Sequence, residues 1–170
     1  MYPQPRSSTY DKTDIEKRWH LTDRVFFACG ACHVLAYAFL ECFPEAQAKA
    51  LWLKPAKGFS GNHIFVSYGD WAFDYHGFSK HEALIQHFIN RARHYWPDWK
   101  AELIELPKEV LISEAKSKTY DGLWLREPDK HYLHDALPRA QNFIQRFSPP
   151  PACNSRSHPA RSIAIPAKGD

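Results

Sequence analysis

FFACGACHVLAYAFLE, residues 26–41, is the stretch that decides the fold of this chain. It opens with small residues around Cys29 and Cys32 and continues with apolar residues at helical spacing. The pattern predicts a helix with Cys32 in its first turn, ending near Pro44 because proline disfavours helical backbone at the preceding residue. A thiol at a helix start lies beside unpaired N–H groups and the positive end of the helix dipole, which favour the reactive thiolate.

Composition limits the classes of protein that this chain can belong to. Its 170 residues are 44% hydrophobic, which suits a domain with a packed core and not a disordered chain. The net charge of +3 comes from interspersed charges, so we expect no nucleic-acid partner. We see no signal peptide and no apolar run of about 18 residues, so we expect a cytoplasmic protein that does not enter the membrane.

The chain combines helical patterns with an antiparallel hairpin, which predicts an α+β fold. Thr13 with Glu16 predicts a capped helical turn or two over residues 13–20. The later pattern predicts, in order, a turn at 45–50, a short strand at 51–53, a hairpin over 63–76, a long helix closed by Pro97, a strand at 101–106, a short edge strand at 123–125 and a last helix from about 135 to 147. We expect the cysteine helix to pack on an antiparallel sheet, with further helices toward the C-terminus.

The domain organisation follows from the same patterns. We expect a flexible arm over residues 1–12, a single domain over 13–147 and a Pro-rich disordered tail over 148–170. Ser79 with Glu82 forms a capping box that predicts the start of the long helix. The basic residues that accompany this helix are expected to be a solvated face: Lys80, Arg91, Arg93 and Lys100.

The hairpin over residues 63–76 has a register that the sequence defines. Gly69 and Asp70 form a two-residue turn between two alternating strands. Such a turn pairs Tyr68 with Trp71, and every other pair follows from this one. Directly opposed residues point to the same side of the hairpin.

This register predicts a polar group on one side of the hairpin. His63, Phe65, Asp74 and His76 share one face, and Asp74 is the diagonal neighbour of His63. The opposite face is almost wholly apolar and needs a core. A cysteine helix beside this hairpin can therefore present a thiol, an imidazole and a carboxylate together. His76 is a rival for the role of base, because it lies opposite His63.

Those three groups are the ones that thiol nucleophilic catalysis requires. The thiol of Cys32 must lose its proton, an imidazole must accept and return a proton, and a carboxylate must fix the imidazole tautomer. Backbone N–H groups at the helix start can donate to the oxyanion that forms at the attacked carbonyl.

Two motifs carry a resemblance to a known superfamily. CGACH at 29–33 resembles the papain signature, and HIFVSYGDWAFDYHG at 63–77 looks like the transglutaminase-like order of His, strand, turn and Asp. The chain thus resembles the papain-like and transglutaminase-like cysteine hydrolases over roughly residues 24–78. The position of the family's oxyanion glutamine, six residues before the nucleophile, is Phe26 here.

The resemblance implies a papain/transglutaminase-like core with Cys32 as nucleophile, His63 as base and Asp74 as the residue that orients it. It implies acyl transfer on a protein or peptide substrate, by hydrolysis, deamidation or transamidation, with no cofactor and no metal. The substrate and the oligomeric state stay open.

Five more residues have expected roles. The candidate auxiliary residues are Cys29, Asn62, His33 and His76. Of these, Cys29 is expected to be structural and His33 to lie at the rim beside the nucleophile. Cys42 is expected in the core.

Two alternative functions use the same residues. C-x-x-C after an apolar segment also resembles a thioredoxin-like oxidoreductase that would use Cys29 and Cys32, although no proline occurs at residues 61–63, where that fold expects one. A non-catalytic binding module on the same scaffold would keep an aromatic groove without an activated thiol. Haem attachment through C-x-x-C-H is disfavoured, because Met1 is the only methionine that could serve as an axial ligand. A zinc site is disfavoured, because no second pair of Cys or His ligands has standard spacing.

Overall fold

Five antiparallel strands form the centre of the fold, in the order β4-β3-β2-β1-β5. The computed structural model describes residues 13–148, so the expected arm and all but the first residue of the expected tail lie outside the described residues. The strands are β1 (Lys49–Pro55), β2 (His63–Tyr68), β3 (Trp71–Asp74), β4 (Gly77–Lys80) and β5 (Ala101–Leu106).

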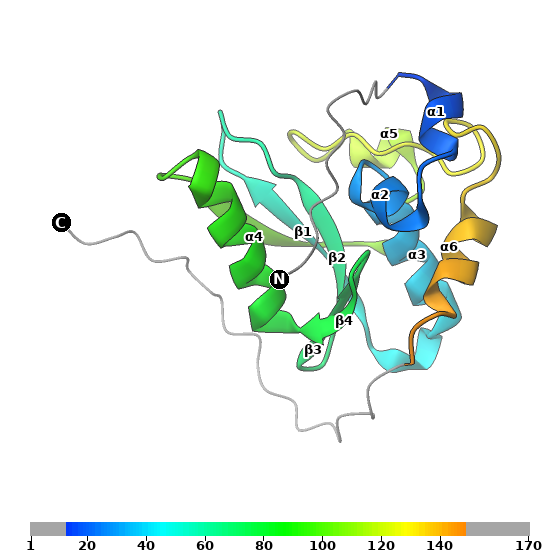
Figure 1. The fold of residues 1–170 in the computed structure, drawn as a ribbon, viewed down its shortest axis with the longest axis horizontal. Coiled ribbons are helices and arrows are strands. Elements are labelled where there is room, and N and C mark those ends of the chain that lie inside the picture. Colours follow the sequence, from blue (N-terminus) through cyan, green and yellow to red (C-terminus); the bar gives the residue numbers. More distant parts are fainter. Residues whose placement is uncertain (1–12, 149–170) are drawn as a thin grey trace.

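Helices cover both faces of this sheet, with α4 on one side and α2, α3 and α6 on the other (Figure 1). The α-helices are α1 (Ile15–Trp19), α2 (Asp23–Ala28), α3 (Cys32–Cys42), α4 (His81–Tyr95), α5 (Glu114–Ser117) and α6 (Leu137–Ile144), and two single 3₁₀ turns are η1 (Pro44–Ala46) and η2 (Lys108–Val110). The predicted α+β class with an antiparallel sheet is thus confirmed. None of the helices in residues 13–148 has the length and apolar character needed to cross a membrane.

The two faces of β2 are buried in two different cores. Ile64 and Val66 pack with α3 and α6, whereas Phe65 packs with Leu84 and Ile89 of α4. Successive residues of a strand point to opposite faces, which is why adjacent apolar residues serve separate cores. The face that carries His63 is therefore covered by α4, so the site is built in a buried environment.

The predicted hairpin register is confirmed from Tyr68 to Val66, but His76 lies in a turn and does not pair with His63 as predicted. Tyr68 pairs with Trp71, and the next pairs continue the same register as far as Val66 with Phe73. The second strand is shorter than predicted, because β3 ends at Asp74. The chain then turns at residues 75–76 and returns as β4, which pairs with β3.

Strand β4 also corrects the predicted start of the long helix. Ser79 pairs with Ala72 in the sheet, so it cannot cap the helix, and the N-cap of α4 is Lys80. The N-cap of α1 is Asp14 and not Thr13: the Asp14 side chain accepts a hydrogen bond from the backbone N–H of Lys17 at 2.9 Å.

Three further predictions need correction and one is confirmed. Strand β1 begins at Lys49, so it includes residues that were expected in a turn. Residues 123–125 form no strand, although Leu123 and Leu125 are buried. The last helix is shorter than expected at both ends. Strand β5 has the predicted bounds.

Candidate active site

A sharp turn between α2 and α3 positions the thiol of Cys32. Cys29 ends α2, and Gly30 has a φ of 96°, a backbone conformation that favours glycine. The Tyr132 hydroxyl donates a hydrogen bond to the Gly30 carbonyl at 3.0 Å and so ties this turn to a distant part of the chain. Cys32 is the first residue of α3, as predicted.

The Cys32 thiol is half-buried and interacts with two imidazoles, those of His33 and His63. Burial raises the pKa of the thiol, but the interactions with the two histidines outweigh burial and lower it to about 5. The sulfur is therefore a thiolate at neutral pH, which is the nucleophilic form.

The His63 imidazole is fixed by contacts on several sides. Its Nε2–H donates to Asp74 Oδ2 at 3.0 Å, and its ring stacks on Phe88 of α4 with 4.3 Å between centroids. Because Nε2 is bonded to Asp74, Nδ1 is the ring nitrogen left to face Cys32. Burial lowers the pKa of His63, but Asp74 and Cys32 raise it to about 9. Cys32 and His63 thus form a thiolate–imidazolium pair at neutral pH.

Asp74 joins two histidines. Its Oδ2 accepts the His63 hydrogen bond, and its Oδ1 accepts from the backbone N–H of His76 at 2.8 Å and from His76 Nδ1 at 3.1 Å. Burial raises the pKa of Asp74, but the hydrogen bonds from His63 and His76 keep it at about 2. His76 therefore supports the carboxylate, and the imidazoles that act on the thiol are His63 and His33.

His33 does not lie at the rim, as the sequence suggested. It is 2% exposed, and its Nε2–H donates to the carbonyl of Arg126 at 2.9 Å, 93 residues away. Cys42 is exposed and not in the core. Cys29 is half-buried and lines a pocket beside His63.

Phe26 and Asn62 are the two residues considered as side-chain donors to the expected oxyanion. Phe26 is 1% exposed within the core, so its position supplies no donor. Asn62 is exposed, and its Oδ1 accepts a hydrogen bond from Trp52 Nε1 at 2.8 Å. This bond fixes the amide plane and leaves the Asn62 NH₂ group to donate elsewhere.

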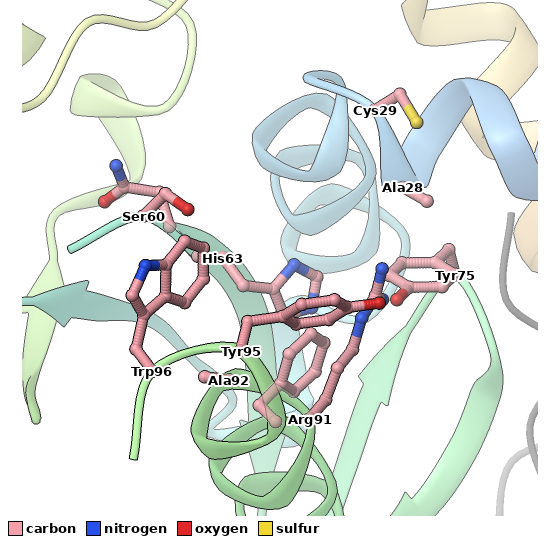
Figure 2. A pocket seen from close by; sticks show the side chains of 12 residues that line it. Ala28, Cys29, Ser60, His63, Tyr75, Arg91, Ala92, Tyr95 and Trp96 are labelled. Carbon is pink, nitrogen blue, oxygen red and sulfur yellow. The ribbon is translucent and has the colours of Figure 1, made fainter. Parts of the chain in front are cut away.

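A pocket of about 290 Å³ opens beside His63, between α4 and the loop before β2 (Figure 2). Arg91 of α4 lines it, together with Phe88 and Tyr95. Arg91 was expected on a solvated face, but it lies in the wall of this pocket. The signal was its spacing: Phe88, Arg91 and Tyr95 are three and four residues apart, so they share one side of a helix.

The surroundings of Cys29 and Cys32 also bear on the redox and metal-binding alternatives. The segment before Cys29 is the helix α2, whereas the thioredoxin-like interpretation expects a strand there. Cys29 and Cys32 do not form a disulfide with each other. Within residues 13–148, no group of three or more His, Cys, Asp or Glu side chains is arranged to hold a metal ion.

No protein-family model, curated protein or solved structure matches this chain significantly. The resemblance to papain-like and transglutaminase-like hydrolases accordingly remains a prediction from the sequence.

Proposed function

We propose that this chain is a cysteine-dependent acyl-transfer enzyme with a papain/transglutaminase-like core. The observation that carries the proposal is the setting of His63, which interacts with the Cys32 thiol and donates to Asp74 at 3.0 Å. A buried carboxylate, a fixed imidazole and an ionised thiol in that order are the parts of a thiol nucleophile and its acid–base partner.

The reaction begins with attack of the Cys32 thiolate on the carbonyl carbon of an amide. The S–C bond forms and the C–N bond breaks, and the departing nitrogen takes a proton from the His63 imidazolium. His63 then removes a proton from water or an amine, which attacks the thioester and releases Cys32. Asp74 keeps His63 in one tautomer and stabilises its charged form.

Backbone N–H groups in the first turn of α3 are the proposed oxyanion donors, because the first N–H groups of a helix have no intrahelical partners. The NH₂ group of Asn62 is a second proposed donor, directed by the bond from Trp52. The redox alternative is less well supported, because the partners that lower the pKa of Cys32 are His33 and His63.

Trapping of a covalent intermediate tests this function without knowledge of the substrate. The protein is mixed with p-nitrophenyl acetate, and both the nitrophenol burst and the acetylated peptide are measured. We expect one acetyl group per chain, on Cys32, with the burst abolished in Cys32→Ala. In His63→Ala the burst should be slower by at least tenfold, since general acid–base catalysis contributes typically 10²–10⁴-fold.

Cys29→Ala is the matched control, since it removes a thiol from the same turn. It should keep the burst under the acyl-transfer account. A burst that depends equally on Cys29 and Cys32, or acetylation spread over all cysteines with no effect of His63→Ala, would contradict the proposed function.

A further inference from the structure

The pocket beside His63 is lined by Arg91, a cation with no counter-ion among the described residues 13–148. Arg91 is half-buried in the pocket wall, and within residues 13–148 its guanidinium forms no hydrogen bond or ion pair. The pocket lining in that part of the chain includes no Asp or Glu. By contrast, Arg139 and Arg146 both bind the carboxylate of Asp23.

Arg91 is close to the catalytic residues. Figure 2 shows its head group beside the Tyr75 ring and the labelled Tyr95. The Tyr75 ring packs edge-on against His63, with 5.5 Å between centroids. Arg91 and Cys32 both act electrostatically on the Tyr75 hydroxyl.

Aromatic side chains form the outer wall of this pocket. Tyr95 is 66% exposed and Trp96 is 38% exposed, and both line the pocket. Large exposed aromatic rings are concentrated at binding surfaces, because they bury much apolar area with little loss of side-chain freedom. The pocket therefore combines aromatic side chains with a cation that has no acidic partner among the described residues. This combination suits a ligand with an apolar part and one negative group.

We propose that Arg91 binds a carboxylate of the acyl-donor substrate and thereby sets its specificity. The assignment rests on the proposed function. A guanidinium binds a carboxylate through two parallel hydrogen bonds, and a half-buried site strengthens the pair. The carboxylate is either an acidic side chain near the scissile bond or the free C-terminus of a peptide. Tyr95 and Trp96 contact the residue that carries it.

Paired alkylating reagents test this assignment. Iodoacetate carries a carboxylate and iodoacetamide is its neutral analogue, so the ratio of their rates at Cys32 measures preference for an anion. We expect Arg91→Gln to lower this ratio at least threefold through slower reaction with iodoacetate. Arg93→Gln removes the same charge from the same helix outside the pocket lining, and it should leave the ratio unchanged.

The outcomes separate this proposal from the proposed function. If both variants leave the ratio unchanged while Cys32 still reacts in a His63-dependent manner, the role of Arg91 is wrong and the proposed function stands. If Cys32 of the wild type reacts no faster than the exposed Cys42, the proposed function fails and the substrate assignment fails with it.

Protection by small ligands identifies the source of the carboxylate. N-acetyltyrosine, N-acetyl-glutamyl-tyrosinamide and neutral N-acetyltyrosinamide are each tested for slowing iodoacetamide labelling of Cys32. Protection by the first assigns a terminal carboxylate, and protection by the second assigns an acidic side chain. Equal protection by the neutral compound, or protection that persists in Arg91→Gln, overturns the proposal.

Discussion

His63 has a single orientation because three of its neighbours fix it. Asp74 accepts from Nε2, Phe88 stacks on one face and Tyr75 packs edge-on. These contacts define which nitrogen faces the sulfur, so the imidazole can transfer a proton without first reorienting. The Phe88 contact also connects His63 to α4, the helix that carries Arg91.

Replacing Asp74 with Asn tests the role of the carboxylate. The pKa of His63 should fall from about 9 toward its ordinary value of 6.5, because the buried negative charge that stabilises the imidazolium is removed. We expect the acetylation burst of Cys32 at pH 7 to slow by at least tenfold. The free energy of unfolding should fall by about 1–3 kcal/mol, since a buried hydrogen-bond network is disrupted.

Asp98→Asn is the control for that variant, because Asp98 lies in the exposed turn that follows α4. It should change neither the burst nor the stability appreciably. A burst in Asp74→Asn equal to that of the wild type would remove the carboxylate from the mechanism.

At the residue scale, the sequence predicted the site positions that depend only on neighbouring residues in the chain. The proximity of His63 and Asp74 followed from the register of one hairpin, and Cys32 followed from one helix start. The burial of His33 could not be predicted, because its partner is the backbone of Arg126 in a distant segment. The position of Arg91 in the pocket was not predicted, because its positive charge suggested a solvent-exposed face. Its spacing from Phe88 and Tyr95 along the helix indicates the pocket side instead.

Two tight turns position the site at the scale of elements. The turn at Gly30 separates α2 from α3 and exposes the start of the cysteine helix. The turn at residues 75–76 returns the chain from β3 to β4, and Gly77 follows it with a φ of 95°. This second turn brings the His76 backbone N–H and ring onto the Asp74 carboxylate.

Gly77→Ala tests how closely that turn is packed. A Cβ at Gly77 would lie 2.5 Å from Cε1 of Phe147, and the positive φ adds backbone strain. We expect a loss of about 2–4 kcal/mol in the free energy of unfolding, measured by chemical denaturation. Gly58→Ala has nearly the same φ, 94°, with no heavy atom within 4 Å of the Cβ, so it measures the backbone strain alone. Equal losses in the two variants would contradict the packing of Phe147 on this turn.

Strand β4 illustrates why an element with a clear local signal was misassigned. Ser79 and Glu82 have the spacing of a capping box, and this pattern predicted a helix start. Pairing of β4 with β3 places Ser79 in the sheet instead, so the N-cap is Lys80 and the helix begins one residue later than predicted. A pairing between two four-residue strands depends on tertiary contacts and leaves a weak pattern in the sequence.

At the scale of the whole molecule, burial on both faces of the sheet determines the chemistry of the site. The sequence predicted that one face of the hairpin would need a core, but it did not predict that α4 would cover the other face. His63 and Asp74 are consequently 3% and 2% exposed. Their mutual interaction is stronger than it would be in water, because the surroundings are less polar.

The dependence of global stability on pH follows from the ionised thiol. The pKa of Cys32 is about 5 in the folded chain and near its ordinary value of 9.0 when unfolded. A lowered folded pKa contributes stability above the unfolded pKa, and the contribution is lost as the pH falls toward the folded pKa. The difference in free energy of unfolding between wild type and Cys32→Ser should therefore be larger at pH 7 than at pH 5, measured by urea denaturation under reducing conditions. A difference that is constant with pH would contradict an ionised thiol.

The most direct test of the central claim, that Cys32 is a thiolate paired with His63, is the pH dependence of iodoacetamide labelling, read for each cysteine by mass spectrometry. In the wild type, we expect an inflection for Cys32 near pH 5 and for Cys42 above its ordinary value, because burial raises the pKa of Cys42. In His63→Ala the inflection of Cys32 should move upward by more than one pH unit while that of Cys42 stays in place. An inflection of Cys32 near pH 9 in the wild type, or one that does not move when His63 is removed, would contradict the account.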